Sequence, residues 1–85
     1  MRPTTTPSGT EIAVGDADFA ALYRREYPAM IAVATALSGA DGEDLVHDAM
    51  VKAFLNWRTV QHLERPGGWC HRVLVNLCRS WWRRR

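Results

Sequence analysis

The side chains of this chain that are best suited to chemistry lie near its C-terminus. Four of them follow one another at intervals of three or four residues: Arg72, Asn76, Arg79 and Arg83. A helix brings residues at this spacing onto one face. Guanidinium groups contact phosphates, and a carboxamide pairs with base edges. Val75 and Trp82 lie alongside, and the Trp82 ring can stack on a base. The pattern therefore predicts a nucleic-acid surface.

The charge distribution supports this prediction. Residues 1–64 carry five basic and nine acidic side chains, a charge of −4, whereas residues 65–85 carry six arginines and no acid, a charge of +6, and the sum is the formal +2 of the chain. A solvated helix face usually mixes both signs. The acid-free segment therefore indicates a polyanionic partner, and we expect DNA and no membrane. Binding to an anionic membrane is the main alternative, because Trp82 beside Arg83 to Arg85 also suits an interfacial helix.

A second surface is expected on the segment from about residue 41 to residue 59. One arc of this helix is acidic but contains two aliphatic residues: Asp44, His47, Asp48, Val51, Leu55 and Arg58. Aliphatic side chains within a charged face are typical of a surface that docks a helix of another protein. The alternative, two scattered surface aliphatics, is equally compatible with the spacing.

Catalysis and metal binding are not expected. The G-x-S-x-G, Walker and H-E-x-x-H patterns do not occur, and adjacent carboxylates at Glu43 and Asp44 diverge by about 100° on a helix. Cys70 and Cys78 would lie about 12 Å apart along one helix, too far for a disulfide, and their spacing to the histidines fits no metal site. We predict a protein that is not an enzyme and has no cofactor, with both cysteines buried.

An all-α fold of three to four helices must position these surfaces. Residues 1–15 are rich in threonine, proline and glycine and are predicted to be a flexible tail, which leaves residues 16–85 as one small helical domain. The first helix is expected to begin at Asp16 or Asp18, with apolar residues at helical spacing up to Ser38-Gly39. Pro28 predicts either a kink or two helices in series.

The later helices have clear boundaries in the sequence. Asp41 is a candidate N-cap for a helix that ends near Trp57 or Thr59, and residues 60–68 are predicted to be a connector. The last helix runs from Trp69 to about Arg84, and its expected apolar face consists of Cys70, Val73, Leu74, Leu77, Cys78 and Trp81. The longest apolar stretch, Ala29 to Ala34, is too short to span a bilayer, and no secretory signal is evident, so a cytoplasmic location is expected.

Three segments carry a family resemblance. They are Asp18-Phe19-x-x-Leu22-Tyr23-x-x-x-Tyr27, Gly42-Glu43-Asp44-Leu45-Val46-His47-Asp48-Ala49, and Pro66-Gly67-Gly68-Trp69-Cys70-His71-Arg72-Val73-Leu74-Val75-Asn76-Leu77. In this order and at these separations they resemble the region-two domain of bacterial RNA polymerase sigma factors of the extracytoplasmic-function group. The resemblance covers about residues 16–85.

The resemblance implies a role for each surface. The second helix would dock on the clamp coiled coil of the largest polymerase subunit through Asp44, His47, Asp48, Val51 and Leu55. The last helix and the preceding loop would recognise and open the promoter −10 element, holding a flipped non-template base in a loop pocket. The residues expected to contact DNA are Gln61, His62, Arg65, Arg72, Asn76, Arg79, Trp82 and Arg83.

The resemblance also implies further partners. Members of the family continue into a second helical domain that recognises the −35 element, and this domain would lie beyond Arg85. An anti-sigma protein can also be a partner. The alternative function is therefore a truncated sigma-like module that binds core polymerase or an anti-sigma partner without initiating transcription.

Overall fold

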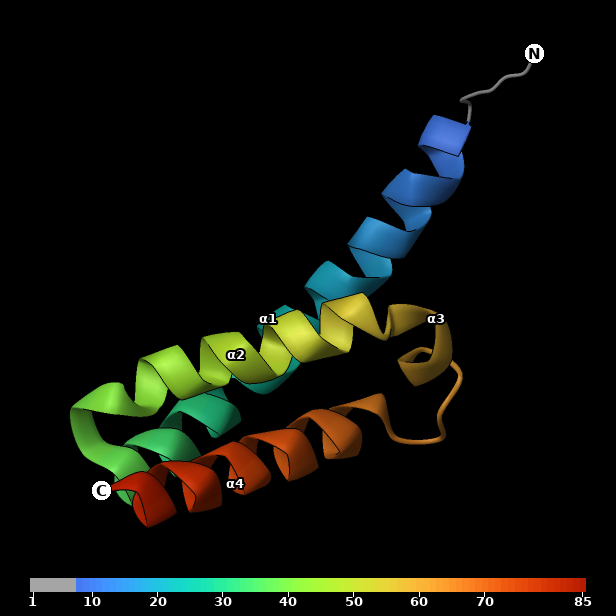
Figure 1. Cartoon of the computed structure of the whole chain (residues 1–85). Helices are drawn as coiled ribbons and strands as arrows, with labels where there is room; N and C mark the ends of the chain where they lie inside the picture. Colours follow the sequence, from blue (N-terminus) through green and yellow to red (C-terminus); the bar gives the residue numbers. More distant parts are fainter. Residues whose placement is uncertain (1–7) are drawn as a thin grey trace.

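The protein is an all-α bundle, as the sequence predicts. The computed structural model describes residues 8–85, in which the elements are α1 (Ser8–Ser38), the 3-10 turn η1 (Gly39–Asp41), α2 (Gly42–Leu55), the short α3 (Trp57–Val60) and α4 (Pro66–Arg84) (Figure 1). The three long helices α1, α2 and α4 each pack against the other two. No strand occurs among the described residues.

Helix α1 begins earlier than predicted. It starts at Ser8, so the expected start at Asp16 or Asp18 is wrong and residues 8–15 of the predicted tail are helical, while residues 1–7 lie outside the described residues. Isolated glycines such as Gly9 and Gly15 cost a helix only about 1 kcal/mol each relative to alanine, so they do not end it. The first turns of α1 extend away from the rest of the bundle (Figure 1).

Helix α1 passes through Pro28 without dividing into two helices. Proline lacks an amide hydrogen and cannot bond to the carbonyl four residues earlier. Pro28 is exposed, whereas Met30 and Ala34 beyond it are fully buried. The apolar spacing therefore continues across the proline, and packing of this face holds the helix together.

The core forms between the three long helices. Its fully or almost fully buried members are small or medium-sized side chains: Leu22, Met30, Ala34, Leu45, Val46, Ala49, Met50, Ala53, Cys70, Leu74 and Cys78. Tyr27, Trp57 and Trp81 pack around it as half-buried side chains. The apolar face predicted for the last helix is thereby confirmed, and the two cysteines are buried and free.

The turn between α1 and α2 depends on two glycines. Gly39 has φ of 61°, a left-handed conformation that glycine adopts without steric cost. Gly42 lies so close to α1 that a Cβ atom there would be 2.8 Å from the backbone carbon of Ala34. Asp41 is the N-cap residue of α2, as predicted, but its side chain makes no capping hydrogen bond, so the capping role expected of its carboxylate is wrong.

Two boundaries around α3 also differ from the sequence prediction. Helix α2 ends at Leu55 rather than near Trp57 or Thr59, because Asn56 leaves helical geometry (φ −108°, ψ 18°). Its Nδ2 donates a 2.8 Å hydrogen bond to the carbonyl oxygen of Lys52, which also accepts the last helical bond from the Asn56 amide nitrogen (3.1 Å). Helix α4 begins at Pro66, three residues before the predicted Trp69. Proline suits a first helical position, where no amide hydrogen is needed. No helix in the described residues is long and apolar enough to cross a membrane.

Candidate functional site

The exposed side of α4 carries the residues that the sequence singled out. Arg72, Asn76, Arg79 and Arg83 are all exposed, and we call them the arginine face. Arg83 donates a 3.0 Å hydrogen bond to Ser80 Oγ on the same helix. Among the described side chains, no ion pair engages any of these arginines. Their guanidinium groups are therefore available to an external anion.

A cavity of about 490 Å³ lies where the connector meets the first turns of α4. We call it the loop cavity; its lining residues are Leu63, Glu64, Arg65, Gly68, Trp69 and Arg72. The structure thus brings Arg65 and Arg72 together. Gln61 and His62 are exposed in the same connector but do not line the cavity. Trp69 lines it with part of its surface and packs against the core with the rest.

A second cavity, of about 510 Å³, lies near the C-terminal end of α4 against the end of α1. It is lined by Leu37, Val75, Cys78, Arg79, Trp82 and Arg83. Trp82 Nε1 donates a 2.6 Å hydrogen bond to the carbonyl oxygen of Leu37, while 60% of the residue remains exposed. The indole N–H is therefore already engaged, and only the ring faces are free to contact a ligand.

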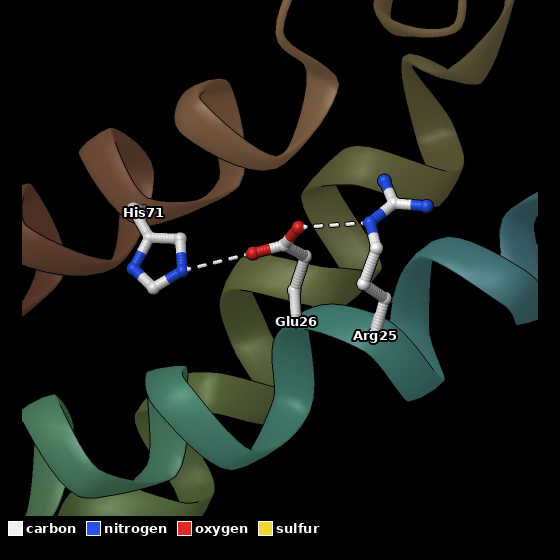
Figure 2. Close-up of polar contacts among 3 residues, drawn as sticks. All are labelled: Arg25, Glu26 and His71. Atoms are coloured by element: carbon white, nitrogen blue, oxygen red, sulfur yellow. Dashed lines mark hydrogen bonds and ion pairs between the residues drawn. The ribbon is translucent and has the colours of Figure 1, made fainter.

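Contacts at both ends of α4 fix the direction of the arginine face. At the N-terminal end, His71 Nε2 lies 3.2 Å from Glu26 Oε1 of α1, and Arg25 Nε lies 3.1 Å from Glu26 Oε2 (Figure 2). At the other end, Trp81 Nε1 donates a 2.7 Å hydrogen bond to Asp41 Oδ2. With the buried residues of α4 in the core, these contacts turn the arginine face to solvent.

Helix α2 presents the second predicted surface. Asp44, His47, Asp48, Val51 and Leu55 are all exposed, and we call them the α2 face. Leu55 is 74% exposed. Phe54, which the sequence analysis did not select, is 51% exposed beside them and contacts the Phe19 ring edge-on at 5.3 Å between centroids. Its position three residues after Val51 was the signal that could have identified it.

The described residues contain no group of three or more side chains that could hold a metal ion. Of the two cysteines, Cys70 has a distinctive environment. Burial, with a smaller contribution from the charge of Glu26, raises its pKa to about 11, although Arg25 opposes the shift. The thiol therefore stays protonated at neutral pH, as expected of a core residue and not of a nucleophile.

Comparison with models of known protein families shows what the chain is similar to. The family model for sigma-70 region 2 matches residues 22–85, which include α2, α3, α4 and the second half of α1. Comparisons with curated proteins and with solved structures gave no match. The match does not separate groups within the family, so the extracytoplasmic-function group stays a prediction.

Proposed function

The chain belongs to the sigma-70 region 2 family, and we propose that it binds the non-template strand of the promoter −10 element through the arginine face and the loop cavity. Domains of this family bind core RNA polymerase and recognise the −10 element in transcription initiation, and the family is not one of enzymes.

One observation carries the proposal. The arginine face continues, at Arg72, into the loop cavity, so a site for phosphates adjoins a hollow of about 490 Å³. A hollow of this size lies in the range of small-ligand sites. Arg65 and Arg72 at its edge suit a phosphate, and the exposed part of Trp69 offers a ring on which a base can stack. An unpaired base with its backbone fits this combination.

Strand separation would then follow from binding alone. A base held in the loop cavity is removed from the duplex, so the protein binds open DNA more tightly than closed DNA and shifts the equilibrium toward the open form. Extruding one base costs a few kcal/mol. Stacking and phosphate contacts at the cavity must supply that free energy, and no bond is made or broken.

We further propose that the α2 face docks on core polymerase, on the clamp coiled coil of its largest subunit. The exposed acids of this face, Asp44 and Asp48, suit a basic partner, and Val51 and Leu55 provide the apolar contact that helix docking requires. Phe54 extends this apolar area.

The DNA proposal is tested with a strand that the protein itself selects. A randomised single-stranded DNA pool is enriched on the chain in complex with core polymerase, and binding is then compared between the selected strand and its scrambled version. We expect the preference for the selected strand to be lost when Arg72, Asn76 and Arg79 become alanine, and to persist in the control Arg24→Ala, an exposed arginine on α1. Equal binding of both strands by the unaltered protein would reduce the claim to general affinity for polyanions.

The core-polymerase proposal has a separate test. Leu55→Ser and Val51→Ser are expected to weaken capture by core enzyme, whereas Leu63→Ser, an exposed leucine outside α2, is not. Unchanged capture by the α2 variants would contradict the proposed surface. A reconstituted transcription reaction then separates the two functions considered from the sequence: transcript formation indicates initiation, and capture without transcript indicates a module that only occupies the polymerase.

A further inference from the structure

The first turn of α4 lacks a cap from its own sequence. Its N-cap residue, Arg65, makes no side-chain capping bond, and no acidic residue lies in the first turn. The first amide groups of a helix have no partner within the helix, and this end carries a partial positive charge. An arginine there has the unfavourable sign. A negative group from elsewhere in the fold would therefore stabilise this end of α4.

Glu26 of α1 supplies that group. Its carboxyl lies against Gly67, so closely that a Cβ atom at Gly67 would be 2.6 Å from Glu26 Cδ. One turn further along α4, His71 Nε2 lies 3.2 Å from Glu26 Oε1, at hydrogen-bond distance (Figure 2). The side chains of Glu26 and His71 are only 21% and 30% exposed. The carboxylate thus contacts two points of the first turns of α4, and the absence of a side chain at Gly67 makes this approach possible.

The same turns of α4 form one wall of the loop cavity. Gly68, Trp69 and Arg72 line the cavity, and they alternate in the chain with Gly67 and His71, which face Glu26. Within a helix, fixing one face of a turn fixes the other. We propose that Glu26 is a positioning residue that holds this wall of the loop cavity in place through Gly67 and His71. The effect of Glu26 on the selection of a DNA strand rests on the proposed function. Its effect on the position of the cavity wall does not.

Two neighbouring glycines allow a matched test. Alanine at Gly67 would displace the Glu26 carboxylate, which can move because it is the end of a flexible side chain. Alanine at Gly68 would meet only Arg65 Cβ at 3.5 Å, an ordinary contact. Both changes add one methyl group to the same turn of α4. A difference between Gly67→Ala and Gly68→Ala therefore reports the position of the Glu26 carboxylate and not a general effect of alanine.

The first measurement is amide hydrogen exchange in residues 69–73 of the 85-residue chain, the first residues of α4 whose amide hydrogens have a backbone partner. Because a charge at a helix end typically contributes about 0.3 to 1 kcal/mol, we expect exchange to be about 2- to 5-fold faster in Gly67→Ala than in Gly68→Ala, and in Glu26→Ala than in the unaltered protein. Gly68→Ala should exchange no faster than the unaltered protein, because its methyl group meets only an ordinary contact and alanine favours a helix over glycine. The double variant Gly67→Ala with Glu26→Ala should exchange no faster than either single variant, because both remove the same contact.

The second measurement is the ratio of affinities for the selected and scrambled DNA strands. A residue that only stabilised the fold would not change this ratio in the folded fraction, whereas a positioning residue should lower it. We expect the ratio to fall in Gly67→Ala and Glu26→Ala and to be partly retained in Glu26→Gln, whose amide oxygen can still accept a hydrogen bond from His71.

The two measurements separate the two proposals. Faster exchange in Gly67→Ala but not in Gly68→Ala supports the positioning role of Glu26. If the unaltered protein selects no DNA strand, that result overturns the proposed function and leaves the positioning role standing. Identical exchange in the two alanine variants would overturn the positioning role. Faster exchange with an unchanged affinity ratio would overturn its part in strand selection.

Discussion

Trp81 Nε1 donates a 2.7 Å hydrogen bond to Asp41 Oδ2, and this contact joins the C-terminal end of α4 to the turn between α1 and α2. The Arg85 guanidinium lies 4.6 Å from the centre of the Trp81 ring, within the range of a cation–π contact. Together with Glu26 and His71 at the other end, the bond ties α4 to the rest of the bundle at two points. Both ties use side chains far apart in the sequence.

The hydrogen bond between Trp81 and Asp41 predicts a specific loss of stability when Asp41 is replaced. Asp41→Ala leaves the half-buried indole N–H without its acceptor and should lower the free energy of unfolding by about 1 to 3 kcal/mol. Asp41→Asn keeps an acceptor oxygen and should cost less. Asp44→Ala is the control, because Asp44 is an exposed acid in the first turn of α2. Urea unfolding followed by circular dichroism measures these differences, and an equal effect of the two alanine changes would contradict the assigned role of the bond.

The two turn glycines predict different costs. Gly42→Ala places a Cβ 2.8 Å from Ala34 C and Thr35 N, which are backbone atoms and cannot move aside, so we expect a loss of about 2 to 3 kcal/mol. Gly39→Ala meets no atom within 4 Å, and its left-handed φ of 61° should cost about 1 to 2 kcal/mol. Urea unfolding of both variants checks this order, and a greater loss at Gly39 would contradict it.

The sequence predicts the faces of the helices better than their ends. Leu74, Cys70 and Cys78 are buried as their spacing requires, because burial on a helix follows directly from a period of 3.6 residues. The end of α2 at Asn56 coincides with a side-chain hydrogen bond from Asn56 to the carbonyl oxygen of Lys52, which also accepts the helical bond from the Asn56 amide. Differences of about 1 kcal/mol decide such boundaries, and spacing alone does not resolve them.

The sequence did not predict the side-chain contacts that join one helix to another. Asp41 has the residue type and position of an N-cap, and only the arrival of Trp81 from α4 explains why its carboxylate points elsewhere. The sequence did not indicate a role for Glu26, because its partners Gly67 and His71 become its neighbours only when α1 and α4 pack. The exposed faces of α2 and α4 could be predicted, whereas the contacts that orient them required the fold.

The buried thiol of Cys70 predicts how stability depends on pH. Its pKa rises from 9.0 to about 11 on folding, so the folded state favours the protonated thiol. The resulting stabilisation is complete below pH 9 and is lost as the pH rises through 11. Two pKa units correspond to about 2 to 3 kcal/mol. Urea unfolding between pH 8 and 11 should show this loss, and Cys70→Ala, although less stable at pH 8, should show a smaller one; equal slopes in both proteins would contradict the prediction.

The salt dependence of strand binding tests whether the arginines contact phosphates. Each phosphate contact to a single strand contributes about −0.7 to the slope of log K against log salt, so four contacts, by Arg65, Arg72, Arg79 and Arg83, predict a slope near −3. Replacing Arg79 with glutamine should reduce the magnitude of the slope by about 0.7. Arg24→Gln removes the same charge from α1, and should leave the slope unchanged because long-range charge effects between exposed groups are screened. If both variants changed the slope equally, the binding would follow the net charge of the protein and not a located contact on α4.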